Sequence, residues 1–327
     1  MLKLIFLVFG CSAIVGLVWH IGPDSIINTA SQLGPMALVL ILCPMVVVYG
    51  LEAFGWRLTL GSYAQRVGFA KLFAIRMAGE SVNVTTPTAY VGGEPLKAYL
   101  LKQYDVPFVE GLASVVTAKT TMTIAQVLFI LLGIGLSFWI LGPSEHYVMA
   151  ALASVGLLAF GVLLFVMVQK YGLGMGCLRL LQACGIHWKF LEARQATLQE
   201  LDGTIQNFYT NHYRTFYAAI ITFFFAWLLE TLEVYAILYF LDASVDVLTS
   251  VSIAALTVFI KGSTFFIPGS VGAQEAGYVL LLVAYGYPDV TGITFALIRR
   301  LREILWIGVG LICLILLKGR ESIPTGD

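Results

Sequence analysis

Charged residues inside apolar stretches are the side chains of this sequence with the clearest capacity for chemistry. Arg299, Arg300, Arg302 and Glu303 lie about three turns into the last apolar stretch, and Lys119 lies at a comparable depth in an earlier one. On insertion scales, a charge at the centre of a membrane helix costs about 2.5–3.5 kcal/mol. These five charges are therefore expected to be paired with other charges, hydrated or used to bind a ligand.

Seven further charged residues are candidate partners for them, namely Glu52, Glu80, Glu94, Glu230, Glu233, Lys261 and Glu275. Two interpretations stay open. The charges neutralise one another and only fix helix register, or Lys119, Arg299, Arg300 and Arg302 form a site for an anionic headgroup. Glu94 and Glu275 are either acids that begin a helix or groups that take up a proton or cation as the anion leaves.

Composition predicts the class of protein. Hydrophobic residues make up 59% of the 327 residues and charged residues only 12%, which is typical of an integral membrane protein. The 19 basic and 19 acidic residues cancel, so no nucleic-acid partner is expected. Five cysteines, an odd number that lies largely in apolar stretches, do not suggest a disulfide framework.

Six apolar stretches are long enough to cross a membrane. They cover residues 2–19, 35–56, 109–141, 147–168, 215–241 and 290–317. A cleaved signal peptide would resemble the first, but no small-residue cleavage site follows it. Basic residues concentrate between the second and third stretches, and after the last one, so the positive-inside rule places both termini in the cytoplasm and predicts a multi-pass protein of the cytoplasmic membrane.

Two further apolar segments, 69–104 and 244–287, are each interrupted near the middle by Gly and Pro. Their pieces, such as Phe69–Val82 and Leu96–Tyr104, are too short to cross about 30 Å of hydrocarbon. We interpret both segments as re-entrant helical hairpins, whose broken backbone must be buried in protein or line a wet cavity. A pair of interfacial helices is the alternative for the first.

The two hairpins belong to an internal repeat with an offset of 181 residues. This offset superposes Pro87 on Pro268, Glu94 on Glu275, Tyr104 on Tyr285, Pro107 on Pro288, Gly111 on Gly292, Glu52 on Glu233 and Lys119 on Arg300. The second and fifth stretches are repeat mates that cross in opposite directions, so the repeat is predicted to be inverted. The halves cover about 1–141 and 147–317 of a single membrane domain, 1–327, with an all-α fold.

Each hairpin breaks at a proline, Pro87 or Pro268, and restarts a helix after glycine. The restart positions are Gly92 and Gly93 in the first hairpin, and Gly269 and Gly272 in the second. Free N–H groups at such helix starts attract phosphate or carboxylate near the midplane of inverted-repeat transporters. We therefore expect the two hairpin tips to face each other and to contribute to the anion site.

An amphipathic segment, 189–212, lies between the halves, with apolar residues at heptad spacing such as Leu198 and Ile205. It is predicted to lie on the cytoplasmic surface as a helix. A homo-oligomer or a biosynthetic partner that binds through this helix is a further expectation.

The hairpin residues resemble a known family. The pattern Asn83, Pro87, Gly92-Gly93-Glu94 and Lys97, followed by Pro268-Gly269, Gly272 and Glu275, is similar to that of flippase-like membrane proteins related to the transmembrane region of lysylphosphatidylglycerol synthase. The resemblance covers most of the chain and is to stand-alone members, including those associated with hopanoids. It implies handling of a phospholipid, a hopanoid-type lipid or a polyprenyl-linked lipid. The second hairpin has Ala273 and Gln274 where the first has two glycines, so the tips need not be equivalent.

The predicted function is translocation of an anionic-headed lipid or lipid-linked intermediate by alternating access. Enzymatic activity, cofactors and metal sites are not expected, because the sequence has no P-loop and its four histidines are scattered. The residues after Leu317 are too few to form the aminoacyl-transferase domain of the synthases. An intramembrane enzyme that modifies a headgroup and a non-transporting scaffold are the alternatives.

Overall fold

The computed structural model describes residues 22–86, 92–142, 195–264 and 272–317, with Ser270 and isolated positions between 15 and 182. The described residues are almost entirely helical and contain no strand. The helices are α2 (Pro23–Thr59), α3 (Phe69–Thr85), α4 (Gly93–Leu101), α5 (Phe108–Leu141), α9 (Gln195–Asn211), α10 (Tyr213–Phe240), α11 (Val247–Ser263), α12 (Ala273–Ala284) and α13 (Asp289–Leu316). Short 3₁₀ turns, Gly61–Gln65 and Lys102–Tyr104, follow α2 and α4.

Three helices are long and apolar enough to cross a membrane: Gly34–Thr59 within α2, then α5 and α10. They coincide with the predicted stretches 35–56, 109–141 and 215–241. The last predicted stretch is also one helix, α13, but four charges interrupt its hydropathy. The predicted stretches 2–19 and 147–168 lie outside the described residues, apart from a few isolated positions. The chain is thus an all-helical, multi-pass membrane protein.

The residues just before the second predicted stretch are already helical. Pro23 suits the first turn of a helix, and α2 runs from there until Gly34 breaks its geometry with a φ of 73°. Pro35 cannot donate a backbone hydrogen bond, and the apolar helix continues after it. The Gly34-Pro35 step therefore kinks α2 instead of starting it.

Short helices pair where hairpins were predicted. α3 packs on α4, and α11 packs on α12. At 1.5 Å per residue, the 17 residues of α3 and of α11 each span about 25 Å, less than the hydrocarbon core. α3 continues to Thr85 and α4 begins at Gly93, so the first break is shorter than predicted. Pro87, Pro268 and Gly269 lie outside the described residues.

Backbone geometry repeats with the same offset of 181 residues. A left-handed backbone follows the first helix of each half, at Gly61 (φ 55°) and Asp242 (φ 53°). Another follows the second hairpin helix, at Asp105 (φ 58°) and Gly286 (φ 85°). Next, Pro107 and Pro288 are the residues that immediately precede α5 and α13.

Close packing repeats as well. A Cβ added at Gly111 would lie 3.5 Å from Ala98 Cα, and one at Gly292 would lie 3.0 Å from Val279 Cα, which is the equivalent residue of α12. These glycines let α5 approach α4 and let α13 approach α12 in the same way. The two halves thus share turns, helix starts and a helix contact.

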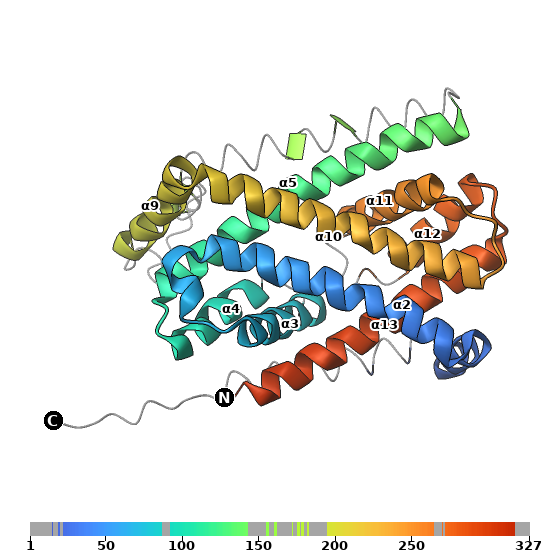
Figure 1. Cartoon of the computed structure of the whole chain (residues 1–327), viewed down its shortest axis with the longest axis horizontal. Coiled ribbons are helices and arrows are strands. Elements are labelled where there is room, and N and C mark those ends of the chain that lie inside the picture. The colour runs from blue at the N-terminus through green and yellow to red at the C-terminus, as the bar shows by residue number, and fades with distance from the viewer. Residues whose placement is uncertain are drawn as a thin grey trace.

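The halves interlock. α2 and α10 lie side by side and run in opposite directions, as α5 and α13 also run opposite to one another (Figure 1). α3 packs mainly on α13 of the other half, and α11 packs on α5. Ser81 donates to the Ile307 carbonyl across the first interface (3.1 Å), and Ser252 donates to the Gly133 carbonyl across the second (2.8 Å). Each hairpin is therefore held by the long helix of the opposite half.

The predicted surface helix is present as α9, although residues 189–194 lie outside the described residues. Leu201 and Ile205 on its apolar face are buried against Ala113 of α5. This contact with the bundle occupies part of the face that was expected to lie on a membrane or bind a partner.

Candidate functional site

Every ion pair among the described residues joins charges within the bundle. The pairs form four groups: Arg76 with Glu52; Lys97 and Lys119 with Glu80 and Glu94; Lys261 and Arg300 with Glu275 and Glu303; Arg299 and Arg302 with Glu230 and Glu233. We call these the Arg76 pair, the Lys119 group, the Arg300 group and the Arg299 group. Each contains as many basic as acidic side chains, which offsets the cost of burying them.

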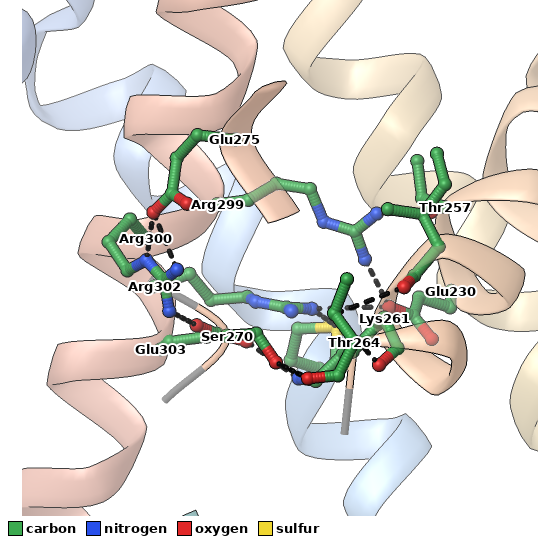
Figure 2. A network of polar contacts seen from close by, with 12 residues as sticks. Glu230, Thr257, Lys261, Thr264, Ser270, Glu275, Arg299, Arg300, Arg302 and Glu303 are labelled. Atoms are coloured by element: carbon green, nitrogen blue, oxygen red, sulfur yellow. Dashed lines mark hydrogen bonds and ion pairs between the residues drawn. The ribbon is translucent and has the colours of Figure 1, made fainter. Parts of the chain in front are cut away.

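The Arg299 group joins α13 to α10 (Figure 2). Arg299 bonds Glu230 and lies 3.4 Å from Glu233, and Arg302 lies 2.7 Å from Glu233 and 3.5 Å from Glu230. Arg299 also donates to the Thr257 hydroxyl at 2.5 Å. Glu233 has no exposed surface, and both arginine side chains are at most 5% exposed. This group is a fully buried crosslink.

The Arg300 group ties the second hairpin to α13 (Figure 2). Arg300 lies 2.5 Å from Glu275 of α12 and 2.7 Å from Glu303, one turn further along its own helix. Lys261 of α11 completes the group by a 2.6 Å contact with Glu303. The planar guanidinium serves two carboxylates at once, as arginine commonly does.

The Lys119 group connects the first hairpin to α5, with lysines in place of arginine. Lys97 of α4 lies 2.5 Å from Glu80 of α3 and 3.0 Å from Glu94. Lys119 of α5 lies 3.9 Å from Glu94, beyond hydrogen-bond distance, and its side chain is 42% exposed. Lys119 is therefore the least tightly held cation of the four groups.

The Arg76 pair lies between α2 and α3. Arg76 bonds Glu52, and its guanidinium stacks 5.4 Å from the ring centre of Tyr49. Both charged side chains are almost fully buried. Arg76 and Lys97 were counted among the basic residues of a cytoplasmic segment, but the structure buries both. The spacing of Glu94 and Lys97 on one helix was a signal that these two residues pair. The partner of Arg76 lies on another helix, so no local spacing marked it.

The Asn83 and Gly-Gly-Glu motif holds the first hairpin together. The Asn83 side chain accepts a hydrogen bond from the Gly93 N–H (2.7 Å) and donates to Glu94 (3.1 Å). A Cβ at Gly93 would collide with the Gly79 carbonyl, so only glycine lets α4 approach α3 this closely. These contacts give the motif a structural role in addition to any role in binding.

The helix starts of the two hairpins do not offer the N–H groups that were expected to be free. Gly93 donates to Asn83, and the Gly272 N–H donates to Glu275 at 2.8 Å. The expectation was wrong at these two positions because polar side chains near each break satisfy the exposed backbone. Glu275 thus acts as a helix-start acid and as a partner of Arg300.

A cavity of about 290 Å³ lies where the four groups meet. Its lining comes from both halves, with Glu52, Arg76, Glu80, Lys119, Glu230, Lys261, Arg299, Arg302 and Glu303 as the charged members. Uncharged polar side chains such as Thr123 and Gln126 also line it. A smaller cavity of about 30 Å³ beside it is bordered by Glu94, Lys97 and Lys119.

Most of the charged site residues predicted from the sequence either line this cavity or contact residues that line it. Arg300, Glu94, Glu233 and Glu275 do not line the main cavity, but each pairs with a residue of the four groups. Gly92, Gly93 and Gly272 are not part of its lining. Tyr49, Trp227 and Trp306 also line the cavity, and neither charge nor motif marks them in the sequence.

A comparison with protein families assigns the chain to one of them. Residues 2–311 match the model of the lysylphosphatidylglycerol synthase TM region. The chain belongs to this family. The resemblance inferred from the hairpin motif is thereby confirmed, and the family match extends over nearly the whole chain.

Among curated proteins, the chain is similar to a UPF0104 membrane protein of Methanothermobacter thermautotrophicus. The two are 25% identical over 300 residues, which cover 88% of this chain and 86% of the relative. No solved structure matches the chain.

Proposed function

We propose that this protein moves a lipid with an anionic headgroup across the cytoplasmic membrane by alternating access. The observation that carries the proposal is the cavity of about 290 Å³, which lies within an apolar bundle yet is lined by charges from both halves. Charges at membrane depth are costly, and typically mark the path of a polar substrate. A headgroup would occupy this cavity while its acyl chains remain in the lipid.

The repeat supports the mechanism. Helix starts, left-handed turns and glycine contacts recur 181 residues apart, and the mates α2 and α10 run antiparallel. We take the two halves to be an inverted repeat, whose exchange of conformation would open the cavity first to one side and then to the other. That the chain crosses the membrane six times is also part of this proposal.

Charges at the two ends of the bundle support an orientation. The described residues at the end where α2 finishes and α10 begins include Arg57, Arg66, Lys71, Lys102 and Arg214. At the opposite end lie Asp24, Asp242, Asp246 and Asp289, without Lys or Arg in the described part. By the positive-inside rule, the basic end faces the cytoplasm.

The structure directs attention from the arginines to the lysines as first contacts for the headgroup. Arg299, Arg300 and Arg302 are each held by two carboxylates. Lys119 and Lys261 line the cavity with side chains 42% and 36% exposed, so a phosphate can reach them without breaking a buried pair. The arginines would then set the shape of the site and the field within it.

Two partly buried tryptophans add buried N–H donors to the lining. The N–H groups of Trp227 and Trp306 have no hydrogen-bond partner among the described residues. A buried donor without a partner costs about 1–3 kcal/mol. Phosphate oxygens accept hydrogen bonds only, so a small shift that brings these donors to a headgroup would recover that free energy.

Leaflet exchange in vesicles tests the proposal. The purified full-length chain in liposomes, with phospholipids labelled on an acyl chain, should accelerate exchange of at least one of them over protein-free liposomes. Glu94→Gln and Arg300→Ala should abolish the acceleration, whereas Lys71→Gln, at an exposed site outside the cavity, should not. Unchanged exchange in both site variants would contradict the assignment of the site.

The same samples separate the alternatives. Mass spectrometry of the recovered lipid would reveal a modified headgroup if the protein is an intramembrane enzyme. If neither exchange nor modification occurs, and a second protein co-purifies through α9, the scaffold alternative gains support.

A further inference from the structure

The balance of charge in the bundle restricts which headgroup the cavity accepts. All four groups are neutral: seven basic side chains meet seven acidic ones, and no further ion pair joins two of the described residues. A headgroup with one net negative charge would leave that charge without compensation inside the bundle. Burying an uncompensated charge is far costlier than burying a paired one.

The accessible charges are of both signs. Lys119, Lys261 and Glu80 line the cavity with side chains 42%, 36% and 30% exposed. The arginine side chains of the Arg299 and Arg300 groups are at most 5% exposed. A ligand in the cavity therefore meets ammonium groups together with a carboxylate.

Glu80 can accept a further donor. One of its oxygens is 2.5 Å from Lys97, and the other accepts a 3.3 Å hydrogen bond from Asn83. A carboxylate offers about four lone-pair sites, so two of them stay available for an amine. Lys119 has the complementary capacity, because its nearest carboxylate oxygen lies 3.9 Å away.

We infer that the transported headgroup is zwitterionic, with its phosphate bound by Lys119 and its amine bound by Glu80, so that its passage moves no net charge. The inference rests on the proposed translocation of a phosphate-bearing lipid and departs from it in one respect: an amine balances the anionic phosphate, so the headgroup carries no net charge. Glu80 is then the residue that selects against purely anionic lipids.

The experiment compares two lipids in the same vesicles of the full-length chain. Phosphatidylethanolamine and phosphatidylglycerol, each fluorescently labelled on an acyl chain, differ in the amine of the headgroup. Exchange of phosphatidylethanolamine is expected to be about tenfold faster or more, because an unpaired charge in a membrane interior costs more than 1.4 kcal/mol. An imposed potassium diffusion potential should leave its rate unchanged.

Two variants test the assigned roles. Glu80→Gln removes the amine partner and leaves the four groups with one excess positive charge, so phosphatidylglycerol should become the faster lipid. Lys119→Gln should slow both. Lys71→Gln, on the same helix as Glu80 but outside the cavity lining, should keep the preference of the unmodified protein.

The outcomes separate the inference from the function on which it rests. If phosphatidylglycerol exchanges as fast as phosphatidylethanolamine, the inference is overturned while translocation stands. If neither lipid exchanges, translocation of these lipids and the inference both fail. Should Glu80→Gln lower the unfolding midpoint, the partly exposed Lys119→Gln, and the potential dependence of the unmodified protein, still decide the matter.

Discussion

Glu94 and Lys119 in the first half occupy the positions of Glu275 and Arg300 in the second. In the first half, the nearest charged atoms are 3.9 Å apart, and Lys119 is 42% exposed. In the second, they are 2.5 Å apart, and Arg300 is 3% exposed. The same position therefore carries an accessible cation in one half and a buried cation in the other.

Two substitutions between the halves account for the difference. Arginine presents a planar fork that holds two carboxylates, whereas lysine presents one compact ammonium group. Arg300 has the second carboxylate it needs in Glu303, 2.7 Å away, while the equivalent of Glu303 in the first half is Met122. The two halves can thus share backbone features while one half supplies a rigid crosslink and the other an accessible charge.

Replacing Arg300 or Lys119 by an uncharged residue should give the largest difference in stability between the two halves. Arg300→Met leaves Glu275 without its cation and Glu303 with Lys261 alone, and should lower the free energy of unfolding by about 3–5 kcal/mol. Lys119→Met breaks a long, partly hydrated contact and should cost at most about 1 kcal/mol. Unfolding midpoints in detergent, compared between the two variants, measure the difference. Equal losses would show that the two pairs are energetically equivalent and would remove the basis of the comparison.

Substitution of glycines at the α5–α11 and α13–α3 interfaces should give the next largest loss of stability. A Cβ at Gly133 would collide with Ala255 of α11, and one at Gly310 with Ser81 and the Met77 carbonyl of α3. Gly133→Ala and Gly310→Ala should each destabilise the protein by about 1–3 kcal/mol through overpacking.

Neighbouring glycines provide the controls. Gly135 and Gly308, on the same helices, have no atom within 4 Å of an added Cβ. Gly135→Ala and Gly308→Ala should leave the unfolding midpoint unchanged or slightly raised. Loss of stability in only one of the two interface variants would mean that the hairpins are not held in equivalent ways.

The first helices of the two hairpins, α3 and α11, begin differently, and we expect from this a smaller difference in stability that depends on pH. Asp246 caps α11 by accepting hydrogen bonds from the N–H groups of Leu248 (3.1 Å) and Thr249 (3.4 Å), whereas α3 has no side-chain cap. The hydrogen bond from Thr249, together with those from the backbone, lowers the pKa of Asp246. Its contribution is therefore fully present above the unfolded pKa of about 3.9 and is lost as the pH falls through the lower folded value.

Substitution checks this contribution. Asp246→Ala should cost about 0.5–2 kcal/mol at neutral pH. Asp246→Asn keeps a cap without a titrating group, so it should reduce the loss of stability between pH 5 and pH 3. The measurement is the unfolding midpoint against pH. A pH profile in Asp246→Asn identical to that of the unmodified protein would assign the acid sensitivity to other carboxylates.

Helical stretches and hairpins were predictable because they depend on local properties. Apolar runs longer than a bilayer predict spans, and Gly or Pro in a shorter run predicts a break. The repeat of Glu94 and Lys119 at Glu275 and Arg300 also follows from their order in the chain. Arg76 and Lys97 were counted only as basic residues that mark the cytoplasmic side, because the sequence does not reveal that Glu52 or Glu80 lies within reach of them.

The sequence alone indicates that this is a membrane protein, that it contains a repeat and that its buried charges need compensation. Hydropathy and charge are properties of each residue, so these conclusions need no tertiary structure. Which carboxylate compensates which cation required the folded structure. Arg302 meets Glu233 across 69 positions of chain, and Ser81 meets Ile307 across 226. Such contacts arise only when α3 packs on α13 and α10 packs beside α2, and that packing leaves Lys119 accessible while it encloses Arg300.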